Sequence, residues 1–121
     1  MQQTTQLRSV MVADIFMSGG FTLLLLVAAE PLGEWLAIDP IALRLIGAVL
    51  AVHVAILGWS VRSGRVEAGA RYAVVANGAW VVAAAVVLLA GWLVTVAAVA
   101  LVVVSVAVGA FAVLQVQGLA A

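Results

Sequence analysis

Asp14 is the residue whose setting most strongly suggests chemistry. It lies inside the apolar stretch from Val10 to Ala29, and about 20 apolar residues are enough to cross a hydrocarbon core of about 30 Å. A charged side chain at the bilayer centre costs on the order of 2.5–3.5 kcal/mol on insertion scales. We therefore expect Asp14 to face protein, water or a partner rather than lipid.

Three polar residues are predicted to lie with Asp14. Ser18 and Thr22 follow it at helical spacing, so they share one face of the same helix. Asn77, in a later apolar stretch, should enter the membrane from the same side and to a similar depth. A hydrogen bond between Asp14 and Asn77, with Ser18 nearby, is therefore expected in the cytoplasmic half. The group is interpreted either as a proton or cation site or as a polar clamp between helices.

His53 is the single histidine and lies near the middle of the second apolar stretch. A helical projection places it opposite a face of small residues, Gly47, Ala51 and Ala55. Small residues let membrane helices approach closely, and if that face packs inward His53 points towards lipid or another protein. Because a polar side chain directed at lipid is disfavoured, either His53 meets a partner or a second copy, or the bundle interior is the opposite face. We predict His53 and Trp80 as partner or ligand contacts. Imidazole also binds haem iron or chlorophyll magnesium, and a hydrogen-bonded packing role is the simplest alternative.

The composition argues against several other kinds of site. There is no cysteine, so disulfides and thiolate sites are excluded, and one histidine cannot form a multi-histidine metal site within one chain. The serines and threonines lack a base at hydrogen-bonding spacing, and no phosphate-binding glycine loop is present. With zero net charge and no lysine, no basic surface suggests nucleic acid. We expect a non-enzymatic protein with no metal site, no resident cofactor and no nucleic-acid partner.

The elements that carry these residues are predicted to be membrane helices. The chain is 68% hydrophobic and 8% charged, whereas soluble domains are about 45–50% apolar. Secretory signals have apolar cores of about 7–15 residues, so the longer first stretch is expected to be a retained span. We predict an all-α, integral membrane four-helix bundle, a single domain over 1–121 with helices at about 7–29, 41–61, 72–90 and 93–116.

Turn residues and charges predict how the spans are connected and oriented. Pro31 should end the first helix, and Asp39 followed by Pro40 should cap the second. Arg8 precedes the first span, and three more arginines lie between the second and third. The positive-inside rule therefore places both termini in the cytoplasm. Arg44 lies near the other side, where an ion pair at the outer interface is expected with Glu30, Glu34 or Asp39.

Two resemblances to known proteins add to these expectations. The segment ADIFMSGG, Ala13 to Gly20, resembles the first helix of the small multidrug resistance transporters. That resemblance covers one helix and implies that Asp14 is the proton and substrate site. The whole layout is similar to uncharacterised small bacterial four-span membrane proteins. The residues that carry this second resemblance are Ala13-Asp14, Arg44 with Gly47, Asn77 to Trp80-Val81, and Gln115. This resemblance implies a multi-pass protein of the bacterial inner membrane.

Three functions are compatible with the sequence. The first is an accessory or assembly subunit that acts through helix–helix contacts in the lipid bilayer, as a homo-oligomer or within a larger membrane complex, with His53 at the contact. The alternative is a small proton-coupled transporter or ion channel that uses Asp14. The second alternative is binding of haem or another pigment through His53.

Overall fold

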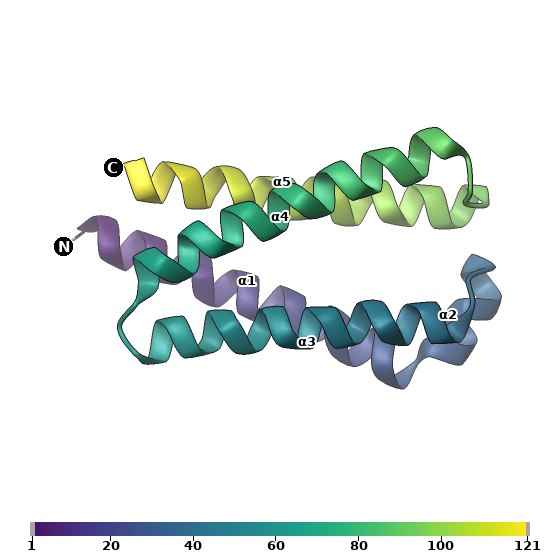
Figure 1. Cartoon of the computed structure of the whole chain (residues 1–121), viewed down its shortest axis with the longest axis horizontal. Coiled ribbons are helices and arrows are strands. Elements are labelled where there is room, and N and C mark those ends of the chain that lie inside the picture. Colours follow the sequence, from purple (N-terminus) through teal and green to yellow (C-terminus); the bar gives the residue numbers. More distant parts are fainter. Residues whose placement is uncertain (1, 121) are drawn as a thin grey trace.

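The structure, a computed structural model, describes residues 2–120 as helices joined by short turns, with no strand among them. The predicted all-α fold is confirmed. Both chain ends lie at one end of the bundle, which we call the termini end, and α2 lies at the other, the α2 end (Figure 1). The helices are α1 (Gln2–Val27), α2 (Ala29–Leu36), α3 (Pro40–Arg62), α4 (Val66–Ala90) and α5 (Thr95–Ala120).

Four of these helices have the length and composition of membrane spans. The spanning segments of α1, α3, α4 and α5 have 23 to 26 residues, and their mean hydropathy is 2.1 to 2.8. Large apolar side chains such as Phe16 and Leu89 point outward, as expected where lipid rather than water surrounds the bundle. The chain is therefore a multi-pass membrane protein.

The segment around Pro31 differs from the prediction, because it starts a helix instead of only ending one. α1 ends at Val27, and Pro31 is the third residue of α2. A proline is tolerated there because the first backbone N–H groups of a helix have no intrahelical acceptor. Ala37 caps the end of α2, directly after Leu36. It adopts a left-handed conformation and donates its N–H to the carbonyl of Gly33.

The third span ends at Ala90 as predicted, and the other helix boundaries differ from the prediction by one to six residues. The Oδ1 atom of Asp39 accepts a hydrogen bond of 2.8 Å from the backbone N–H of Ile41, so the predicted cap of α3 is confirmed. α4 begins at Val66 rather than Tyr72, because an apolar face extends into the polar segment and Glu67 suits the positive end of the helix dipole. α5 begins at Thr95 and continues to Ala120.

The inward face of α3 also differs from the prediction. A series at i, i+4 and i+8 rotates by about 40° at each step of an α-helix, so Gly47 is buried while Ala55 is exposed. The buried positions instead follow a spacing close to the 3.5-residue repeat of packed helices. That repeat turns His53 into the bundle, and the buried set is Leu43, Gly47, His53, Leu57, Ser60 and Val61.

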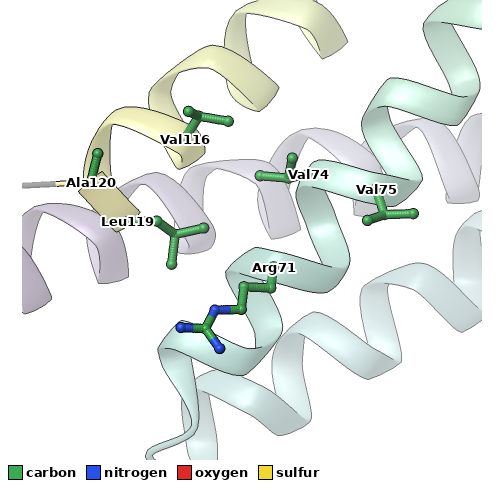
Figure 2. A pocket seen from close by; sticks show the side chains of 6 residues that line it. All are labelled: Arg71, Val74, Val75, Val116, Leu119 and Ala120. Carbon is green, nitrogen blue, oxygen red and sulfur yellow. The ribbon is translucent and has the colours of Figure 1, made fainter.

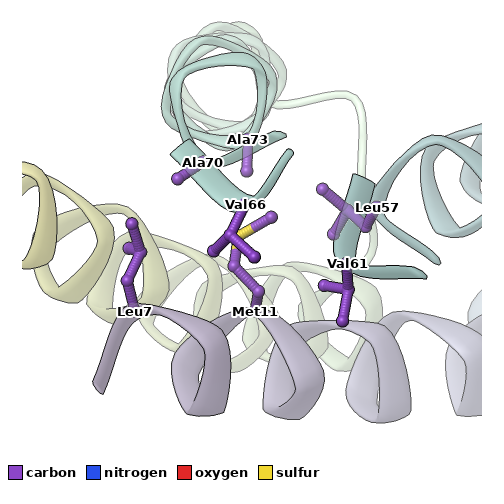
Figure 3. Close-up of a cluster of buried hydrophobic side chains, with 7 residues drawn as sticks. All are labelled: Leu7, Met11, Leu57, Val61, Val66, Ala70 and Ala73. Carbon is purple, nitrogen blue, oxygen red and sulfur yellow. The ribbon is translucent and has the colours of Figure 1, made fainter. Parts of the chain in front are cut away.

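An apolar core closes the bundle near the termini end. It is made by the first turns of α1, the last turns of α3 and the first turns of α4 (Figure 3). α3 and α4 come so close there that a Cβ atom on Gly69 would overlap Ser60. This termini-end core consists of Leu7, Met11, Leu57, Val61, Val66, Ala70 and Ala73.

Candidate functional site

Each of the four spans contributes a polar side chain to one buried cluster. Asp14 comes from α1, His53 from α3, Asn77 from α4 and Gln115 from α5, and their exposed fractions are 1%, 7%, 6% and 0%. Two further residues join them through hydrogen bonds. We call the whole set the Asp14 cluster: Asp14, Ser18, His53, Tyr72, Asn77 and Gln115.

Asp14 is the acceptor at the centre of the cluster. Its Oδ2 atom accepts from Gln115 Nε2 at 2.8 Å and from Asn77 Nδ2 at 3.1 Å. Its Oδ1 atom accepts from the Ser18 hydroxyl at 2.8 Å. The predicted hydrogen bond between Asp14 and Asn77 is confirmed. An ionised carboxylate offers about four acceptor positions, and these donors replace the water that a buried charge loses.

Gln115 is a member that sequence reasoning did not include among the candidate site residues. Its Oε1 atom accepts from Asn77 Nδ2 at 3.1 Å, and its Nε2 atom also lies 3.8 Å from the sulfur of Met11. The predicted fourth span ended at 116, which made Gln115 look like a terminal residue. Since α5 continues to Ala120, the amide lies inside the helix. The sequence does contain a signal for this site, because the amide of Gln115 stands between the apolar residues Leu114 and Val116.

His53 lies inside the bundle, so of the two orientations that the sequence left open, the one that faces a partner does not occur in this structure. Its Nε2 atom is 3.7 Å from Asp14 Oδ1, and its Nδ1 atom is 3.1 Å from the Tyr72 hydroxyl. The two rings are 5.5 Å apart between centroids and tilted by 40°. Both ring nitrogens therefore face oxygen atoms of the protein, and neither is directed at an outside partner.

Tyr72 is the second member that the sequence did not assign to the site. The predicted third span, 72–90, placed it at the very start of a helix. Because α4 starts at Val66, the half-buried Tyr72 lies in its second turn and packs against the termini-end core. The contacts Tyr72–His53–Asp14–Ser18 thus form a continuous polar chain across α4, α3 and α1.

The termini-end core separates Asp14 from the chain ends. Leu7 and Met11 precede Asp14 on the same helix, and Leu57 and Val61 follow His53 on theirs. These side chains place apolar material directly between the carboxylate and the termini end. His53 and Tyr72 form a polar connection from Asp14 towards that end.

The remaining predicted residues lie outside the cluster. Arg44 pairs with Glu30 at 3.6 Å, and both side chains are largely exposed, so the pair contributes about 0–1 kcal/mol. Asp39 caps α3 instead of joining this pair, and Glu34 is exposed on α2.

Trp80 is half-buried on α4, one turn beyond Asn77. The indole Nε1 of Trp80 and the hydroxyl of Ser105 are buried, and neither has a hydrogen-bond partner among the described residues. A buried donor without a partner is disfavoured by about 1–3 kcal/mol. Among the described residues, the Trp80 indole therefore makes no hydrogen bond to the Asp14 cluster.

The chemistry open to the cluster is proton exchange, because Asp14, His53 and Tyr72 each carry a group that can gain or lose a proton. In residues 2–120 no third His, Cys, Asp or Glu joins Asp14 and His53 as a metal ligand. No family model, curated protein or solved structure matches this chain. What the protein does is therefore inferred from the Asp14 cluster.

Proposed function

We propose that this protein is a small proton-coupled transporter or channel of a bacterial inner membrane, with Asp14 as its proton carrier. One observation carries the proposal: Asp14 and His53 approach to 3.7 Å inside the bundle, although each lies within an apolar span. Ionisable groups that face the interior of a membrane bundle are expensive to place there, and they commonly mark ion pathways and proton relays.

A purely structural clamp explains the cluster less well. Asn77 and Gln115 already link three helices through Asp14 and each other. His53 adds a second ionisable group, yet its distance of 3.7 Å from Asp14 is too long for a hydrogen bond. A group that holds helices together should make that bond in the resting state, whereas a proton donor needs to make it only during transfer.

The relay that we propose uses the polar chain in order. The Tyr72 hydroxyl gives its proton to His53 Nδ1 over 3.1 Å. His53 then gives the proton on Nε2 to Asp14 Oδ1, once that distance shortens from 3.7 Å. Asp14 releases this proton towards the α2 end, along the face of α1 that carries Ser18 and Thr22. The His53 ring, now protonated on Nδ1 alone, rotates to restore an N–H group facing Asp14. Water on the open side of Tyr72 restores the phenolic proton. The Ser18 hydroxyl, which donates to Oδ1 at 2.8 Å, keeps the carboxylate oriented throughout.

The two other functions have less support. The accessory role was inferred from an outward His53, and the buried position of His53 removes that observation, so the accessory role stays a prediction. Binding of haem or chlorophyll would require His53 to leave the Tyr72 hydroxyl or Asp14, because both ring nitrogens face these groups.

The test is proton flux into liposomes that contain the purified protein and a trapped pH indicator. A potassium gradient with an ionophore supplies the voltage. We expect wild-type protein to acidify the lumen faster than empty liposomes. Asp14→Asn should reduce the flux to the level of empty liposomes, and Tyr72→Phe, which removes only the hydroxyl, should slow it about tenfold or more.

Asp39→Asn is the matched control. It makes the same chemical change outside the membrane, where asparagine caps a helix about as well as aspartate, so its flux should equal that of the wild type. Circular dichroism and gel filtration confirm that each variant is folded. Equal flux in Asp14→Asn and wild type, or wild-type flux no faster than empty liposomes, would exclude proton conduction through Asp14 and leave the clamp interpretation.

A further inference from the structure

A groove lies between α4 and α5 at the termini end. It is shallow and open along one side, with a volume of about 490 Å³. Val75 and Val116 are 71% and 49% exposed, so the groove opens on the side of the bundle that faces lipid. It is lined by Arg71, Val74, Val75, Val116, Leu119 and Ala120 (Figure 2).

The groove is charged at one end and apolar along the rest. Arg71 lies near the start of α4, and Val75 follows one turn deeper into the membrane. On α5, Val116 lies one turn deeper than Ala120. Figure 2 shows the Arg71 guanidinium pointing away from Val75, towards the termini end. This order of charged and apolar groups along the membrane axis matches a lipid, with its headgroup at the surface and its chain in the interior.

Arg71 differs from two other arginines, whose guanidinium groups already interact with a carboxylate or an aromatic ring. Arg44 pairs with Glu30, and Arg65 lies 5.2 Å above the Trp59 ring. Arg71 is exposed, and within residues 2–120 no carboxylate lies within ion-pair distance of it. A guanidinium group presents donors whose planar arrangement matches phosphate oxygens.

We infer that this groove binds one anionic phospholipid from the leaflet at the termini end. The phosphate pairs with Arg71, and one acyl chain lies along Val75 and Val116. The sequence-based orientation places this leaflet on the cytoplasmic side, where anionic lipids attract basic residues near the surface. The site is independent of the proposed proton relay, since none of its lining residues belongs to the Asp14 cluster.

The experiment is native mass spectrometry of the protein after incubation with equal amounts of phosphatidylglycerol and phosphatidylcholine that carry identical acyl chains. We expect wild type to retain one phosphatidylglycerol in about fivefold preference, the effect of one arginine beside anionic lipid. Arg71→Gln should bind the two lipids about equally. Arg62→Gln is the matched control, because Arg62 is exposed at the same end and does not line the groove.

A second variant tests the apolar part of the groove. Val116→Trp fills the groove and keeps Arg71, so it should reduce the retention of both lipids. The inference is wrong if wild type shows no preference, if Arg62→Gln lowers the preference as much as Arg71→Gln, or if glycerol phosphate displaces the lipid at equal concentration. A change of oligomeric state in Val116→Trp would also overturn it, because the groove would then be a contact between copies of the chain.

Discussion

Gln115 Nε2 lies 2.8 Å from Asp14 Oδ2, and this hydrogen bond joins the last span to the first. α5 packs along α4 and also meets α1, where Gly118 lies close to Leu7. Apolar association gives little driving force in lipid, because the surroundings are as apolar as the helix. The amide of Gln115 adds a hydrogen-bonded link between α5 and α1.

Replacing Gln115 with leucine should destabilise the bundle by about 1–2 kcal/mol, because hydrogen bonds between membrane helices contribute about this much. The change keeps the side-chain size close to that of glutamine, but Asp14 and Asn77 each lose one of their hydrogen bonds. The measurement is the midpoint of unfolding in mixed micelles with increasing dodecyl sulfate. Gln117→Leu is the control, since Gln117 is exposed on the same helix. Equal midpoints for the two variants would show that the Gln115 contacts are not stabilising.

The sequence predicted the spans and the Asp14–Asn77 contact because both depend on strong local signals. An 18-residue apolar window identifies a span regardless of its neighbours, and a buried acid and a buried amide at equal depth tend to meet. The orientation of His53 could not be predicted in this way. It depends on which face of α3 packs inward, and the burial of Leu57 and Val61 against α1 and α4 decides that face.

Helix ends were the second source of error, and they determined which site residues were missed. Tyr72 and Gln115 each lay near a predicted helix end, where polar residues are expected at a membrane interface. The structure extends α4 and α5 by additional turns at the termini end, so both residues lie within helices. The polar segment 66–71 is helical here because the apolar side of α4 packs on the termini-end core.

Gly69→Ala should destabilise the bundle by about 1–3 kcal/mol, the usual effect of overpacking. A Cβ atom at this position would overlap the Cβ and hydroxyl of Ser60, so α3 and α4 would have to move apart. Gly78→Ala is the control, because a Cβ there meets nothing within 4 Å and alanine favours helix over glycine by about 1 kcal/mol. The same unfolding measurement applies, and a variant of Gly69 as stable as that of Gly78 would contradict the close approach.

Asp39→Ala should lower stability by about 1 kcal/mol, because the Asp39 carboxylate accepts from the Ile41 N–H at the start of α3. Asp39→Asn should leave the unfolding midpoint unchanged, since asparagine supplies an equivalent acceptor oxygen. The comparison of these two variants measures the cap without altering the membrane-spanning part of α3. A loss of stability in Asp39→Asn would mean that the charge, rather than the cap, stabilises this end of the helix.

The His53 ring should carry its proton on Nε2 when Asp14 is ionised. The negative charge of the carboxylate attracts an N–H group and repels a nitrogen lone pair at the 3.7 Å distance between His53 Nε2 and Asp14 Oδ1. Nε2 should therefore carry the proton, and Nδ1 accepts from the Tyr72 hydroxyl. Nitrogen-15 NMR of histidine-labelled protein in nanodiscs reads this directly, because the chain has a single histidine. We expect Tyr72→Phe to shift the Nδ1 signal and Ser105→Ala, far from the ring in sequence and outside the cluster, to shift neither nitrogen. If the wild-type spectrum shows the proton on Nδ1, the direction of the Tyr72–His53–Asp14 relay would have to be reversed.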